Sequence, residues 1–214
     1  MKSIYLTLFG LFISISAQAA VLNMEPSDKK VADVAVIKQA QLLSEDGQKT
    51  ETTLGIVGAG LRKRFFVQVY VAQMLADRVD LFKRTEAEAL NSLMSSQVIG
   101  LHMSFLRALS AEDLVNGFIS GFARNEVDTE KAGVKEFLAT VGGMGDFSPG
   151  SSLTLVGDRR AADSEMLIIE AGSQVKRVNV PNGTVGDIMK LLLGNTSGDG
   201  GLTDLKQQII NFQP

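Results

Sequence analysis

The chain has 214 residues, a formal net charge of −3 at pH 7 and 45% hydrophobic residues, which fits one domain with a substantial core. Its mild acidity argues against the basic surface typical of nucleic-acid-binding proteins. The absence of cysteine excludes disulfides, thiolate nucleophiles and sulfur-ligated metals.

The first nineteen residues have the pattern of a cleavable export signal. Lys2 supplies a positive start, residues 4–15 form an apolar core, and residues 17–19 read Ala-Gln-Ala, a small-x-small cleavage site. The apolar run is too short for a comfortable membrane span. We therefore expect residues 1–19 to be a signal peptide removed before Ala20, no later transmembrane segment, and a location in the periplasm.

The first part of the mature chain is expected to contain a leader and a pair of strands. Residues 20–33 are polar and include Pro26, so we predict a flexible leader there. Residues 34–43 have the composition of a strand. The polar cluster at 44–49 predicts a turn, and residues 52–60 return as the antiparallel partner.

A long strand is predicted over residues 62–75, because apolar and mixed positions alternate along it with a period of two. Glycines at 58 and 60 leave room for a sharp bend just before Arg62. Residues 97–106 form a further strand, with Met103 on its apolar face.

The rest of the chain mixes helices and strands. Ser110 and Asp113 form a capping box, and the helix that follows turns Leu114 and Phe118 inward. The patterns further predict helices over 85–93, 129–142, 184–193 and 202–212, and strands over 151–157, 165–171 and 174–180. This order indicates an α+β protein, one antiparallel sheet with helices packed on one face.

Residues 58–72 read GAGLRKRFFVQVYVA, and this segment resembles the bacterial chalcone isomerase-like domain, which is usually found in exported proteins. Further matches follow in the same order, in the helix 109–122 with Asn125, in residues 180–184, and in the closing segments 192–194 and 205–206. The resemblance places the domain at residues 34–214 and implies an open-faced α+β sandwich.

The resemblance implies a ligand site at two side chains. In chalcone isomerases and the related fatty-acid-binding plant proteins, an arginine after this glycine pair meets an anionic or carbonyl oxygen of the ligand, and Arg62 matches it. Tyr70 falls where the binding proteins tend to have a tyrosine. On one straight strand the two residues would stand roughly 26 Å apart. A shared site therefore requires a turn or bulge between Lys63 and Val67.

The chain departs from the isomerases on their catalytic helix. Those enzymes present a tyrosine and, seven residues on, an asparagine, whereas Leu114 and Gly121 stand near these positions here. Without these groups the chain lacks a means of orienting the substrate and managing its proton. Leu114, Phe118, Met74 and Met103 are candidates for an apolar wall along the ligand tail, although core packing accounts for such residues equally well.

Four other features have structural interpretations. A lone histidine, His102, makes a poor metal site or triad, so a structural role is expected. Glu112 and Asp113 lie in a first helical turn, where acids favour the helix dipole. The glycines at 58–60 lack the helix and third glycine of a dinucleotide site. Read without the resemblance, the basic run 62–64 is a solvated turn.

Taken together, these features predict a non-catalytic periplasmic protein that binds a fatty acid or another lipid-like carboxylate, without cofactor or metal. Arg62 and Tyr70 would hold the head group. One alternative is a chalcone isomerase-type intramolecular lyase acting on a flavonoid-like phenol, because the arginine is retained. Another is a protein-partner module without a small ligand.

Overall fold

The computed structural model of the protein describes residues 20–214, so the expected signal peptide lies outside the described residues. Eight strands form one sheet in chain order, each antiparallel to its neighbour. They are β1 (Leu22–Val31), β2 (Val34–Leu43), β3 (Thr50–Arg64), β4 (Val67–Ala76), β5 (Val98–Phe105), β6 (Ser152–Asp158), β7 (Glu165–Ala171) and β8 (Gln174–Val180).

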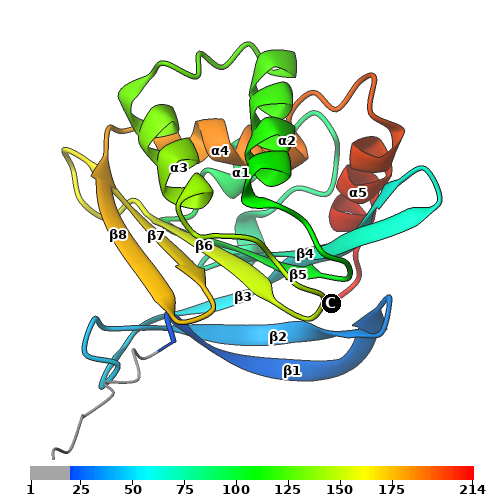
Figure 1. Ribbon diagram of the computed structural model, residues 1–214. Coiled ribbons are helices and arrows are strands. Elements are labelled where there is room, and N and C mark those ends of the chain that lie inside the picture. The colour runs from blue at the N-terminus through cyan, green and yellow to red at the C-terminus, as the bar shows by residue number, and fades with distance from the viewer. Residues whose placement is uncertain (1–19) are drawn as a thin grey trace, which may run out of the picture.

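The helices lie together on one face of this sheet (Figure 1). They are the 3-10 helix η1 (Val79–Leu81) and α1 (Ala89–Leu93), α2 (Ala111–Arg124), α3 (Ala132–Gly142), α4 (Thr184–Leu193) and α5 (Gly200–Ile210). The main core lies between the helices and the sheet and includes Met74, Phe105, Phe122 and Phe137. The predicted α+β class, an open-faced sandwich, is confirmed.

The N-terminal segment differs from its prediction. Residues 20–33 were expected to be a flexible leader, but residues 22–31 form β1 and pair along β2 from Leu22 opposite Leu42 to Val31 opposite Val34. β1 is an edge strand, and proline and lysine are typical residues of exposed edges. The composition that predicted a leader is therefore that of an edge strand.

The first two strands also cover the second face of the sheet. β1 and β2 pass beneath the other strands in Figure 1. The buried side chain of Gln73 on β4 accepts a hydrogen bond from the Ile37 N–H at 2.7 Å, and the Val21 N–H donates to Glu170 on β7 at 3.2 Å. A second buried cluster, which includes Leu42, Leu54 and Ile168, fills the space between these layers.

The predicted strand over residues 62–75 is in fact a hairpin. β3 ends at Arg64 and β4 begins at Val67, so Phe65 and Phe66 form a two-residue loop. Hydrophobic alternation continued across the turn, because the loop residues are themselves aromatic. Sequence periodicity alone therefore gave no sign of the break.

The glycines before Arg62 serve close packing rather than a bend. β3 continues through Gly58 and Gly60, and α5 packs directly on it. A Cβ at Gly58 would overlap the backbone carbonyl of Ile209, and one at Gly60 would come within 2.8 Å of Leu205. Because the glycines admit α5 so closely, the N-terminus of this helix lies beside Arg62.

Candidate functional site

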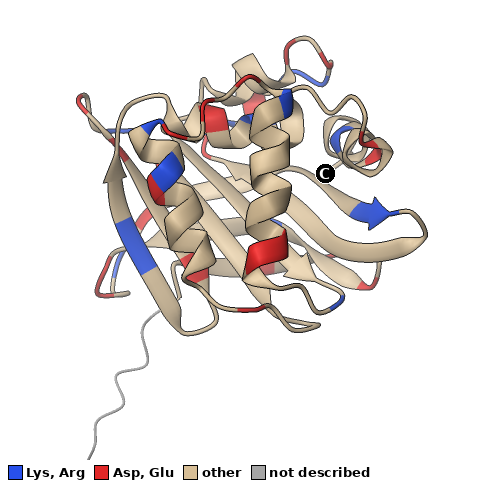
Figure 2. Ribbon diagram, turned by 45° about the horizontal axis from the view of Figure 1, so that its top comes forward, with Lys and Arg blue, Asp and Glu red and all other residues tan. Residues whose placement is uncertain are grey.

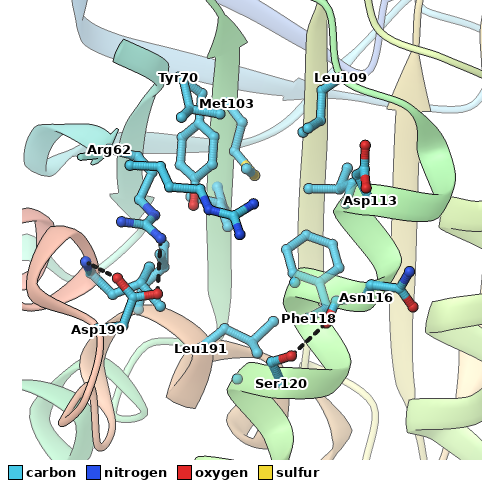
Figure 3. A pocket seen from close by; sticks show the side chains of 18 of the residues that line it. Arg62, Tyr70, Met103, Leu109, Asp113, Asn116, Phe118, Ser120, Leu191 and Asp199 are labelled. Atoms are coloured by element: carbon cyan, nitrogen blue, oxygen red, sulfur yellow. Dashed lines mark hydrogen bonds and ion pairs between the residues drawn. The ribbon is translucent and has the colours of Figure 1, made fainter. Parts of the chain in front are cut away.

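A cavity of about 540 Å³ lies between α2, the β3–β4 hairpin and the N-terminus of α5, above the middle of the sheet. Figure 3 shows Arg62 and Tyr70 on one side and Asp113, Asn116 and Phe118 of α2 on the other. The volume is within the range of small-molecule sites. Its apolar lining comprises Val69, Leu101, Met103, Ala108, Leu109, Leu114, Phe118, Leu155, Leu191, Leu192 and Leu202.

The hairpin brings Arg62 and Tyr70 together. The two residues are direct partners across β3 and β4, and a register shift follows Arg62. Residues opposite each other in an antiparallel pair share one face, with Cβ atoms about 4.5–5.5 Å apart. Both side chains line the cavity. The turn that a shared site requires between Lys63 and Val67 is the hairpin loop.

Tyr70 is positioned by its packing. Only 8% of the residue is exposed, and its ring meets Phe105 edge-on at a centroid distance of 6.1 Å. Burial raises the pKa of Tyr70 to about 12, an effect that the positive charge of Arg62 offsets only in part. The phenol is therefore protonated at neutral pH and can donate a hydrogen bond to an anionic oxygen.

Arg62 is held by an acidic residue that the sequence analysis missed. Its Nη2 lies 2.8 Å from Oδ2 of Asp199, and Nη1 donates to the Lys63 carbonyl. Asp199 is also the N-cap of α5 and accepts the Leu202 N–H at 3.1 Å. The pair is partly buried, with side-chain exposures of 13% for Arg62 and 24% for Asp199. The guanidinium is thus fixed in place and its charge is locally balanced.

Three further arginines line the cavity. Arg64 ends β3, Arg107 lies in the loop before α2, and Arg124 is the last residue of α2. None of the salt bridges within residues 20–214 involves these three side chains. The Nε of Arg124 is buried without a hydrogen-bond partner in the described part of the chain. Against four arginines, the lining contains only Asp113 and Asp199 as acids, so the cavity favours anions.

The structure places three of the four apolar candidates at the cavity. Met103, Leu114 and Phe118 line the cavity, and Met74 does not. Met74 lies four residues beyond Tyr70 on β4, about 13 Å along the strand, and is fully buried in the main core. Met74 lies on the predicted face of the strand, but the helices pack on the sheet there, so its side chain does not reach the cavity.

α2 gives the cavity a mixed wall. Leu114 and Gly121, near the positions of the isomerases' helix-borne groups, both line it. The exposed residues Asp113, Asn116 and Ser120 add polar groups at the mouth, which the sequence analysis did not foresee. The N-terminus of this helix is capped as predicted, since Ser110 Oγ accepts the Asp113 N–H at 3.0 Å.

His102 lies outside the cavity. It shares the second face of β5 with Gly100, and its Nδ1 is 3.0 Å from Thr154 Oγ1 on β6. Burial lowers the pKa of His102 to about 4, so the ring is neutral at physiological pH. Residues 20–214 contain no group of three or more side chains placed to hold a metal ion.

The cavity lies between the sheet and the helices of the open-faced α+β sandwich. The chain belongs to the chalcone isomerase-like family, whose sequence model matches residues 29–204. Among solved structures, it is similar to a fatty-acid-binding protein of Arabidopsis thaliana, with 14% sequence identity and a TM-score of 0.48 over 73% of this chain and 86% of that chain. No functionally curated sequence matches it.

None of the helices in residues 20–214 combines the length and the apolar character that crossing a membrane requires.

Proposed function

We propose that this protein is exported to the periplasm and there binds, without converting it, an amphipathic carboxylate of the fatty-acid type. The observation that carries the proposal is an apolar cavity of about 540 Å³ whose lining contains four arginines and two aspartates. An elongated molecule with one anionic end matches both properties. Each methylene of its tail that leaves water contributes about 0.8 kcal/mol.

Arg62 and Tyr70 would receive the head group. Asp199 and the Lys63 carbonyl already hold the guanidinium, so little side-chain freedom remains to be lost on binding. Tyr70 supplies a neutral donor beside it. Because Asp199 balances the charge of Arg62, the net attraction for a carboxylate comes from Arg64, Arg107 and Arg124.

The apolar residues opposite this pair favour binding over catalysis. Leu114 and Gly121 offer no proton donor or acceptor side chain to the cavity, and the protonated Tyr70 is a poor base at neutral pH. The retained arginine alone supports the alternative of an intramolecular lyase. Assaying a chalcone for cyclisation, followed by absorbance, distinguishes the two functions.

Calorimetric titration with a long-chain fatty acid tests the proposal. We expect saturable binding to the wild type and at least tenfold weaker binding to Arg62→Ala, a loss of about 1.4 kcal/mol or more. The variant removes a head-group donor and leaves the Asp199 carboxylate unpaired beside the bound anion. Arg78→Ala is the matched control, because Arg78 is an exposed arginine outside the cavity. Equal affinities of Arg62→Ala and wild type, or turnover of a chalcone, would contradict the proposal.

A further inference from the structure

The tip of the β3–β4 hairpin exposes adjacent apolar side chains. Phe66 is 100% exposed, Phe65 87% and Val67 45%, and the only other large apolar side chain in residues 20–214 with comparable exposure is Ile119, at 40%. Single exposed apolar residues are common on protein surfaces, but three in succession indicate an interaction site. In Figure 1 this hairpin projects beyond α5.

The backbone conformation of the hairpin tip also indicates an interaction site. Phe65 has a φ of +54° and is the first residue of the two-residue loop. That position favours glycine, since a Cβ there is strained. A strained, solvent-exposed phenylalanine stabilises neither the turn nor the core. Its presence therefore points to a contact outside the folded domain.

Basic residues surround the tip on both faces. Lys63 and Arg64 are consecutive on β3, so their side chains point to opposite sides of the hairpin, and both are exposed. Figure 2 shows this basic end of β3 beside an uncharged loop. No acidic residue occurs between residues 62 and 68.

This arrangement is complementary to an anionic lipid surface. Aromatic rings settle at the level of the headgroups, while lysine and arginine pair with anionic lipids around them. A groove on a protein partner would contact one face of the hairpin, whereas a planar lipid layer surrounds an inserted tip on both faces. Arg64 belongs to the tip and also lines the cavity, so a docked tip places the cavity mouth at the lipid surface.

We propose that residues 63–67, the hairpin tip, insert into the surface of a lipid bilayer that contains anionic lipids. The docking does not depend on the proposed function, because it is inferred from exposure, strain and charge at the tip alone. If the cavity does bind lipid-like carboxylates, docking would also give them a short path between bilayer and protein.

Vesicle flotation tests the docking with the wild-type protein and no added ligand. We expect the protein to float with vesicles of phosphatidylcholine and phosphatidylglycerol, and much less with phosphatidylcholine alone. Phe66→Ser should weaken the binding at least tenfold, and Lys63→Gln severalfold. Ile119→Ser and Lys83→Gln, which alter exposed residues outside the tip, are the matched controls and should bind like the wild type.

A fluorescent reporter gives an independent test, because the chain contains no tryptophan. Phe66→Trp should show a blue-shifted emission on addition of the anionic vesicles, and Ile119→Trp should not. Thermal melts check that the variants are folded, which full exposure of Phe66 leads us to expect. Unchanged flotation of Phe66→Ser would overturn the proposal. So would self-association without vesicles that Phe66→Ser abolishes, since a second copy would then cover the tip.

Discussion

Asp199 neutralises the arginine that the sequence pattern singles out. It holds Arg62 at 2.8 Å and caps α5 with its other oxygen, through the Leu202 N–H. A bound carboxylate would therefore share its guanidinium with a second carboxylate, and the two like charges would repel each other. Asp199 positions Arg62 but weakens its attraction for an anion.

Asp199→Asn tests this balance of charge. Asparagine is as good an N-cap as aspartate, so α5 should keep its stability while the competing charge disappears. We expect fatty-acid affinity to rise roughly fivefold, about 1 kcal/mol. Asp204→Asn is the control, as an exposed aspartate on the same helix outside the cavity. Weaker binding by Asp199→Asn would show that positioning of Arg62 outweighs repulsion.

His102 makes stability depend on pH. Its pKa is about 4 in the folded protein against an ordinary 6.5, so the unfolded chain binds the proton more readily between these values. The contribution of the neutral ring is complete above pH 6.5 and is lost as the pH falls towards 4. At pH 5 this loss amounts to about 1–2 kcal/mol.

Urea unfolding at pH 7.5 and pH 5 measures this effect against His102→Gln. Because the chain has a single histidine, the variant removes all histidine titration. The wild type should lose more stability than the variant between the two pH values. An identical loss in both proteins would mean that the ring is hydrated or paired in the fold.

At the residue scale, the sequence pointed to Arg62 and Tyr70 but not to their partners. These two positions stand out through the family resemblance of residues 58–72. No sequence pattern marks Asp199 as part of the site, because an aspartate before a helix is most simply explained as an N-cap. Arg64 belongs to a basic run that suggests a turn, and Arg107 and Arg124 are distant from Arg62 in sequence. Only the tertiary fold brings these side chains to one cavity.

At the scale of elements, α5 and β3 depend on each other through the glycines of β3. A Cβ at Gly58 would overlap the Ile209 carbonyl, which belongs to a backbone and cannot rotate away as a side chain would. We expect Gly58→Ala to lower the free energy of unfolding by about 1–3 kcal/mol. It should also weaken fatty-acid binding, since α5 contributes Leu202 to the apolar lining of the cavity.

Gly117→Ala is the matched control for that substitution. A Cβ at Gly117, within α2, meets no atom within 4 Å, and alanine favours a helix over glycine by up to about 1 kcal/mol. Chemical unfolding of both variants should therefore shift in opposite directions. If Gly58→Ala proved as stable as the wild type, the close packing of α5 on β3 would be wrong.

Most elements followed from the sequence, and the failures have physical causes. β2, β7, β8 and α4 have the predicted bounds, because turn residues and strong periodicity delimit them. Periodicity predicts one strand across the β3–β4 hairpin, because phenylalanines occupy a loop where glycine or asparagine would mark the turn. Composition predicts a leader in place of β1, because an edge strand buries few of its residues.

At the scale of the whole molecule, one antiparallel sheet separates two cores. The helices and the cavity lie on one face, and β1 and β2 cover part of the other. The order of elements predicted the helical face. It could not predict the covered second face, because that face is closed by contacts between residues distant in sequence, such as Gln73 with Ile37.

A further expectation about the whole molecule is that the protein is exported. The Ala-Gln-Ala site after an apolar run predicts that residues 1–19 are removed. We expect N-terminal sequencing of protein from the periplasmic fraction to begin at Ala20, leaving β1 intact because it starts at Leu22. Recovery with Met1 retained, or only from the cytoplasm, would contradict the expected signal.

Native mass spectrometry of freshly purified protein detects carboxylate binding in the cavity without any added ligand. We expect the wild type to carry a bound species with the mass of an amphipathic carboxylate, which is released on denaturation. This species should be depleted in Arg62→Ala but not in Arg78→Ala. A folded wild-type protein without any such species, even after incubation with long-chain fatty acids, would contradict carboxylate binding in the cavity.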